Sequence, residues 1–193
     1  MTYQALEHIR GFRGIAALTV IVGLALAALA ALVPPSTASD QTLTPLPDTP
    51  EAPAFDLAGP DGERYRLQDM RGKPVIVNFW ATWCPPCRAE MPSIQRAWED
   101  LSDEDILVVG INVGEDAGTV NGFLERTPVT FPLPLDKDSK VVQRWPLRGL
   151  PTTFIVAPDG RLVYKAVGER EWDDQALLDQ VRALKKAEPG ATP

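Results

Sequence analysis

The chain has 193 residues, of which 45% are hydrophobic and 23% charged, and its formal net charge is −7. With 19 basic residues against 26 acidic ones, the balance excludes a protein that coats nucleic acid, because phosphate neutralisation needs clustered positive charge. Two cysteines and one histidine exclude a multi-disulfide scaffold and a four-ligand Cys/His zinc site.

Residues 14–33 form an uncharged apolar stretch. A helix of this length spans about 30 Å, the thickness of the hydrocarbon core of a bilayer. Arg10 and Arg13 precede the stretch, and the next basic residue is Arg64. The positive-inside rule therefore predicts one transmembrane anchor, with residues 1–13 in the cytoplasm and the rest of the chain on the far side. A cleaved signal peptide is the alternative, with an apolar region of normally about 7–15 residues. Both interpretations predict export.

The segment 34–54 is rich in proline, with six prolines among small and polar residues. Proline lacks a backbone N–H and favours extended conformations. We therefore expect a semi-rigid spacer between the membrane and the folded unit, the alternative being a disordered segment without a positioning role. The folded unit is expected to cover residues 55–188, followed by a short tail at 189–193.

The folded unit alternates strand-like and helix-like segments. Period-2 patterns and unbroken apolar runs predict strands, whereas apolar residues at helical spacing predict helices. The expected order is a β-hairpin over 55–67, strands over 74–81 and 107–113, helices over 86–101 and 117–126, a short helix over 138–145, a second hairpin over 152–157 and 161–167, and a closing helix over 172–186. This order predicts an α/β fold whose central sheet is flanked by helices on both faces.

Cys84 and Cys87 lie between the 74–81 strand and the next helix, separated by Pro85 and Pro86. A helix N-terminus offers free N–H groups and a positive dipole end, which stabilise a thiolate. We expect Cys84 to be the attacking thiolate and the more buried Cys87 to resolve the mixed disulfide. A structural disulfide and a metal site are the alternatives, although so short a loop constrains the unfolded chain little.

The segments NFWATWCPPCRAEMP and GLPTTFIVAPDG resemble the membrane-anchored thioredoxin-like oxidoreductases of the TlpA/ResA/DsbE group, over residues 52–187. The resemblance implies a thioredoxin-like fold with a mixed sheet and an N-terminal β-hairpin extension, and no cofactor besides the redox-active disulfide. It implies a cis peptide bond before Pro151, with the backbone of Leu150 open to pairing with a substrate strand. Trp83 is expected to cover the disulfide and meet the substrate.

Two further positions bear on proton transfer. Thioredoxins carry a buried aspartate six residues before the first cysteine, where this chain has Asn78, which cannot take up a proton. Glu90, three residues after Cys87, matches an acidic residue typical of the TlpA/ResA group. If partly desolvated, its carboxyl would have a raised pKa and would move protons to or from Cys87. The alternative is a solvated glutamate on the helix surface.

The resemblance implies a single-pass protein of the cytoplasmic membrane, with its thioredoxin-like domain facing the periplasm or the outer surface. Its predicted substrates are disulfides of exported proteins, such as apocytochrome c or copper-site assembly factors, and a membrane donor of the CcdA/DsbD type would re-reduce it.

Three alternatives remain at this point: a peroxiredoxin-like thiol peroxidase, a copper chaperone and a scaffold module without enzymatic activity. A thiol peroxidase of this kind carries the pattern PxxxTxxC. Counted back from Cys84, the threonine position is Ala81 and the proline position is Val77, so this chain lacks the pattern. A copper chaperone would use a histidine as a ligand besides its cysteines, and the part of the chain that is expected to be exported contains no histidine, which disfavours this alternative.

Overall fold

The computed structural model describes residues 42–185, so the expected membrane segment at 14–33 and the tail at 189–193 lie outside the described residues. Within residues 42–185, no helix combines the length and apolarity that crossing a membrane requires.

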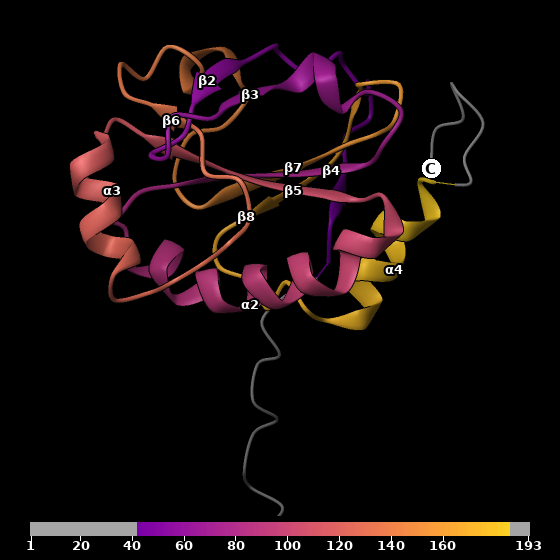
Figure 1. Cartoon of the computed structure of the whole chain (residues 1–193). Coiled ribbons are helices and arrows are strands. Elements are labelled where there is room, and N and C mark those ends of the chain that lie inside the picture. The colour runs from indigo at the N-terminus through magenta and orange to yellow at the C-terminus, as the bar shows by residue number, and fades with distance from the viewer. Residues whose placement is uncertain (1–41, 186–193) are drawn as a thin grey trace, which may run out of the picture. The chain divides into compact units, whose positions relative to one another are not determined.

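A six-stranded sheet forms the centre of the fold, in the order β1-β8-β7-β4-β5-β6 (Figure 1). Strands β4–β5 and β5–β6 pair in parallel, and the other neighbours are antiparallel, so the sheet is mixed, as expected. The strand bounds are β1 Thr44–Pro45, β4 Val75–Trp80, β5 Leu107–Val113, β6 Leu135–Asp136, β7 Thr152–Val156 and β8 Leu162–Val167. All six residues of β4 are buried, because this strand lies inside the sheet and both of its faces are covered.

A separate two-stranded hairpin lies between β1 and β4 in the chain, formed by β2 (Asp56–Ala58) and β3 (Arg64–Arg66). This pairing confirms the expected N-terminal hairpin extension. Its turn includes Gly62, whose φ of 85° lies in the left-handed region that glycine adopts without steric cost.

The three α-helices found within residues 42–185 contribute buried side chains to one face of the sheet. They are α2 (Pro85–Leu101), α3 (Ala117–Leu124) and α4 (Gln175–Ala183), and they share one core cluster with Ile76 and Trp80 of β4. Val77 and Phe79 of β4 point to the other face of the sheet and belong to a second cluster, since side chains alternate along a strand.

The second face is covered without an α-helix, which corrects the expectation of helices on both faces. Its cover comes from Phe55, the 3-10 turn η1 (Leu67–Met70) and Trp145, which follows the 3-10 turn η3 (Val142–Arg144). The segment 138–145 was expected to be helical. It forms only η3. Before this turn, Ser139 has a φ of 57°, outside the right-handed helical region. After it, Trp145 is extended, as Pro146 favours for the residue before it. A further 3-10 turn, η2 (Ser102–Glu104), follows α2.

Residues 42–54, grouped by composition with the spacer, pack along strand β8. Leu43 and Ala52 are buried, and β1 pairs with β8. The amide of Leu162 donates to the carbonyl of Pro50 at 2.8 Å, and the amide of Ala52 donates to the carbonyl of Gly160 at 2.9 Å. A proline lacks only the donor, so its carbonyl still accepts hydrogen bonds from a neighbouring strand. The structured unit therefore begins before residue 55.

Candidate active site

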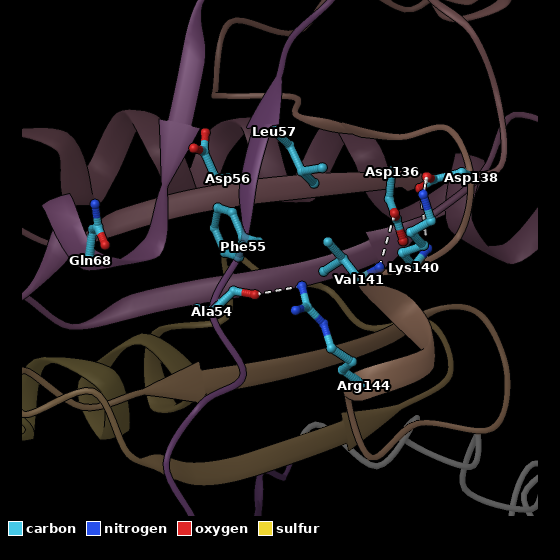
Figure 2. A pocket seen from close by; sticks show the side chains of 10 residues that line it. All are labelled: Ala54, Phe55, Asp56, Leu57, Gln68, Asp136, Asp138, Lys140, Val141 and Arg144. Atoms are coloured by element: carbon cyan, nitrogen blue, oxygen red, sulfur yellow. Dashed lines mark hydrogen bonds and ion pairs between the residues drawn. The ribbon is translucent and has the colours of Figure 1, made fainter.

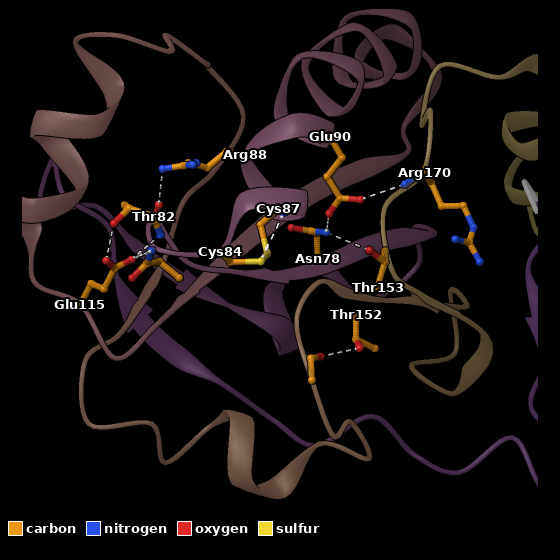
Figure 3. The surroundings of a disulfide bond; sticks show 12 residues. Asn78, Thr82, Cys84, Cys87, Arg88, Glu90, Glu115, Thr152, Thr153 and Arg170 are labelled. Carbon is orange, nitrogen blue, oxygen red and sulfur yellow. Dashed lines mark hydrogen bonds between the residues drawn. A yellow bond between two sulfur atoms is a disulfide. The ribbon is translucent and has the colours of Figure 1, made fainter. Parts of the chain in front are cut away.

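The cysteines lie where the buried strand β4 passes into helix α2 (Figure 3). Cys84 is the N-cap residue of α2, in an extended conformation, and its sulfur accepts a hydrogen bond from the amide of Cys87 at 3.3 Å. Pro85 follows at the first helical position, where the missing N–H has no helical partner to lose. Cys84 and Cys87 form a disulfide with their Cα atoms 5.3 Å apart.

The two cysteines differ in access to solvent in the expected sense. Cys84 is 4% exposed and Cys87 is fully buried. Trp83, directly before the pair, is 65% exposed, which is unusual for so large an apolar side chain. Pro85 is exposed and Pro86 half-buried. An approaching molecule therefore meets Trp83 and Cys84 before it meets Cys87.

The peptide bond between Leu150 and Pro151 is cis, as the resemblance implied. It immediately precedes β7, and the register pairs Thr152 with Phe79 and Thr153 with Asn78. The cis bond therefore lies at the end of β7 that neighbours the carboxyl end of β4, the same end from which the chain leads to the cysteines. Leu150 is half-buried and Pro151 buried.

Glu90 is a buried carboxyl, which excludes the alternative of a solvated surface residue. It is 1% exposed. Its Oε1 accepts from Nδ2 of Asn78 at 2.8 Å, and its Oε2 accepts from the main-chain amide of Arg170 at 3.2 Å and from Nε1 of Trp172 at 3.1 Å. Burial raises the pKa of Glu90 to about 7, against the hydrogen bonds, which lower it, while the charge of Glu169 adds to the rise.

Asn78 connects this carboxyl to the strand that follows the cis bond. Its Nδ2 donates to Glu90 and also to Oγ1 of Thr153 at 2.9 Å. The Asn78 side chain is fully buried, and its Oδ1 has no hydrogen-bond partner among residues 42–185. Asn78 therefore occupies the position of the thioredoxin aspartate as a bridge between Glu90 and β7.

A second carboxylate, Glu115, holds the segment that leads into the cysteines. Its Oε2 accepts from the main-chain amide of Thr82 at 2.7 Å and from Nδ2 of Asn112 at 2.8 Å, and its Oε1 accepts from the Thr82 hydroxyl. On the other side of the segment, Nη1 of Arg88 donates to the carbonyl of Thr82 at 3.4 Å. Arg88 is exposed.

Sequence reasoning identified neither Glu115 nor Trp172 as a site residue. A signal for Glu115 was present, since it follows β5, and the carboxyl ends of the parallel strands β4 and β5 meet at one edge of the sheet. For Trp172 no comparable signal exists. Its contact with Glu90 spans 82 positions of the chain, and only the folded loop after β8 brings it there.

A cavity of about 430 Å³ lies elsewhere, between the β2–β3 hairpin and the segment 136–144 (Figure 2). The buried Asp136 accepts from the amides of Val141 and Val142, and Arg144 donates to the carbonyl of Ala54. These polar groups satisfy one another, and the lining of the cavity includes none of the expected site residues. Over residues 42–185, no group of three or more His, Cys, Asp or Glu side chains is placed to hold a metal ion.

Comparison with known proteins agrees with this geometry. The AhpC/TSA family model matches residues 49–165. Thiol-disulfide oxidoreductase ResA of Bacillus subtilis (strain 168) is 37% identical over 138 residues, covering 72% of this chain and 76% of the relative. ResA of Geobacillus thermodenitrificans is 36% identical over 144 residues, covering 75% and 82%.

Solved structures show the same likeness. A thioredoxin-family thiol:disulfide interchange protein from Chlorobium tepidum superposes with a TM-score of 0.61 at 26% identity, covering 75% of this chain and 99% of the other. The shared fold, the extent of the sequence match and the paired cysteines agree with one another. The chain therefore belongs to the AhpC/TSA family and, within it, to the thioredoxin-like thiol–disulfide oxidoreductases of the ResA and DsbE type.

Proposed function

We propose that the chain is an exported disulfide reductase whose Cys84–Cys87 pair reduces disulfides of other exported proteins. The observation that carries this proposal is the disulfide at the N-terminus of α2, with Cys84 the less buried cysteine and the buried Glu90 one helical turn beyond Cys87. A purely structural disulfide does not need a buried carboxyl with a raised pKa behind it.

The exchange proceeds in two steps. The Cys84 thiolate of the reduced pair attacks one sulfur of the target disulfide, the target S–S bond breaks, and its other sulfur leaves as a thiolate. The Cys87 thiolate then attacks the sulfur of Cys84, which re-forms the intramolecular disulfide and releases the second target sulfur. Two electrons pass to the target. The amide of Cys87, which donates to the Cys84 sulfur in the disulfide form, and the end of the helix favour negative charge on Cys84.

Glu90 is proposed to exchange the proton of Cys87. Proton transfer is most efficient when the pKa of the group lies near the working pH, and the pKa of Glu90 is about 7. We expect Glu90→Gln to slow turnover and to remove from the pH profile of the exchange rate the titration near pH 7. The reduction of a disulfide-containing peptide, measured from pH 5 to 9, tests this expectation. An unchanged profile would reject the role.

Trp83, Leu150 and Pro151 are proposed to receive the target. Trp83 offers an exposed aromatic surface next to Cys84, and the main chain at Leu150, before the cis bond, is proposed to pair with an extended target segment as an added strand. Pro85 and Pro86 fix the backbone between the cysteines.

The proposed location is the cytoplasmic membrane, with residues 14–33 as a single anchor and the thioredoxin-like domain facing the periplasm or the outer surface. Oxidising compartments drive exposed thiol pairs to the disulfide, so a membrane thiol donor of the CcdA/DsbD type is proposed to restore the dithiol. Apocytochrome c and copper-site assembly factors, each with paired cysteines, are the proposed targets.

Trapping in the native cell tests the proposal. In full-length Cys87→Ser, the mixed disulfide at Cys84 cannot be resolved, so exported cysteine-containing proteins are expected to remain bound and to be released by a thiol reductant. Cys84→Ser is the matched control and is expected to trap none of them. Equal recovery with both variants would contradict the proposal, and partners recovered only after peroxide treatment would favour a peroxidase instead.

A further inference from the structure

One polar atom of the buried Asn78 side chain lacks a hydrogen-bond partner. Its side chain is fully buried, and Oδ1 has no hydrogen-bond partner among residues 42–185. Buried amide oxygens in folded proteins nearly always accept a hydrogen bond, so an exception next to a reactive group calls for a physical reason. The amide nitrogen of the same side chain is fully engaged, because it donates to both Glu90 and Thr153.

The position of Asn78 indicates what Oδ1 faces. Cys87 and Glu90 are three residues apart on α2 and project from the same side of the helix, and both are buried toward the sheet. Because Nδ2 of Asn78 reaches Glu90, the amide lies next to the N-terminal part of α2, which also carries Cys87. Figure 3 shows the Oδ1 end of this amide turned to the side of Cys87, away from Thr153.

We propose that Oδ1 of Asn78 accepts a hydrogen bond from the S–H of Cys87 in the dithiol form of the protein. In the disulfide, the sulfur of Cys87 carries no hydrogen, which leaves Oδ1 without a donor. Reduction adds two electrons and two protons to the pair, one proton to each sulfur, and thereby supplies the missing donor. A thiol is a weak donor and an amide oxygen a competent acceptor.

Asn78 is on this basis a positioning residue that acts through Cys87 and Glu90. Its oxygen orients the resolving thiol while its nitrogen orients the carboxyl, so one neutral side chain fixes the distance between the two groups that are proposed to exchange a proton. The inference rests on the proposed exchange reaction for its significance. The hydrogen bond itself is testable without any turnover.

The test uses the infrared S–H stretching band, whose frequency falls when the thiol donates a hydrogen bond. The chain has two cysteines, so full-length Cys84→Ser contains Cys87 as its single thiol and gives one band. Adding Asn78→Leu removes the acceptor, and the band is expected to move to higher frequency. Asn121→Leu is the control, because Asn121 is exposed on α3, and it is expected to leave the band unchanged.

A second variant keeps the test decisive if Asn78→Leu does not fold. Added to Cys84→Ser, Asn78→Asp retains an acceptor of the same size. The band is therefore expected at the frequency seen in Cys84→Ser alone, or below it. In the protein with both cysteines, loss of a hydrogen bond made only by the dithiol is expected to move the equilibrium with glutathione about fivefold toward the disulfide in Asn78→Leu.

The inference would be overturned if Asn78→Leu left the S–H frequency of Cys84→Ser unchanged. It would also be overturned if Asn78→Asp raised that frequency. Either result leaves the trapping experiment with Cys87→Ser unaffected. Conversely, failure of that trap would reject the proposed function while the band still reports on the hydrogen bond.

Discussion

At Glu90, burial and hydrogen bonding act on one carboxyl in opposite directions. Loss of water raises its pKa, and three donors, from Asn78, Arg170 and Trp172, lower it. Burial prevails, and the pKa lies at about 7. The donors keep the ionised form attainable near neutral pH, so both protonation states are accessible to a group one turn from Cys87.

The raised pKa of Glu90 predicts a pH-dependent stability. A carboxyl whose pKa is about 7 when folded and about 4.5 when unfolded stabilises the fold fully below pH 4.5, and this contribution is lost as the pH rises through 7. The loss is about 3 kcal/mol. Urea unfolding of the disulfide form at pH 5 and pH 8 is expected to show this decrease, and Glu90→Gln is expected to remove it. An equal decrease in the variant would assign the effect to other groups.

Trp172 is expected to lower the pKa of Glu90 through its indole N–H. Trp172→Phe removes this donor at 3.1 Å and keeps most of the packing, so the pKa of Glu90 should rise further above 7. Carbon-13 NMR titration of the Glu90 carboxyl measures the change. Trp98→Phe, at a half-buried position on α2, is the control and should leave the pKa of Glu90 unchanged. A pKa shift of the same size in Trp98→Phe would indicate a general loss of packing.

Sequence information at the residue scale was sufficient where a motif carries the chemistry. The spacing of Cys84 and Cys87, the position of Glu90 and the proline at 151 are all local patterns. The placement of the cysteines and Glu90 follows from a strand passing into a helix, whereas Pro151 directly precedes a strand. The partners of Glu90 are not local. Trp172 approaches it from a loop that no spacing rule connects to the cysteines.

At the scale of elements, the connection from β4 to α2 is held from the end of β5. Glu115 follows β5 and accepts three hydrogen bonds, two of them from Thr82. Strand pairing places Trp80 opposite Asn112, so the loops that follow the two strands lie next to each other. The backbone just before Trp83 and Cys84 is thereby fixed by a neighbouring strand as well as by its own helix.

Glu115→Ala is expected to lower the free energy of unfolding by about 2 kcal/mol, because it leaves the main-chain amide of Thr82 and Nδ2 of Asn112 without their acceptor. Chemical denaturation of the disulfide form measures the loss. Glu125→Ala replaces an exposed glutamate at the end of α3 and should change stability by less than about 0.5 kcal/mol. Similar losses in both variants would contradict the role of Glu115.

The elements of the sheet were predictable to within a residue or two where apolar runs are long, as in β4 and β5. The two-residue strands β1 and β6 were not predictable, since a segment that short has no periodicity to read. The expected helix over 138–145 is interrupted at Ser139, whose positive φ no sequence pattern indicates, and it ends before Trp145, which is extended next to Pro146.

At the scale of the whole described unit, the N-terminal segment 43–52 closes one end of the core. Leu43 is 5% exposed and belongs to the same cluster as Cys87 and Trp172. A segment that looks like a linker by composition therefore contributes to the core that surrounds the site. Composition could not reveal this, because Pro50, one of the prolines that suggest a spacer, pairs with β8 through its carbonyl, which its missing N–H does not affect.

Leu43→Ala is expected to destabilise the protein by about 3 kcal/mol, through lost burial and the cavity that remains. The half-buried Leu46 lies three residues further along the same segment, and Leu46→Ala should cost less because more of its surface already meets water. Urea denaturation of the two variants tests the order. A negligible effect at Leu43 would show that the segment 43–52 is dispensable for the core.

By lying along β8, residues 43–52 also occupy main-chain groups through which a second copy could otherwise extend the sheet. Leu46 donates to the carbonyl of Val163, and Pro50 accepts from Leu162, so this border is already paired within the molecule. The opposite border ends in the two-residue β6, too short to template a long strand. Within residues 42–185, the fold thus leaves little unpaired main chain at the borders of the sheet through which copies of the protein could associate into fibres.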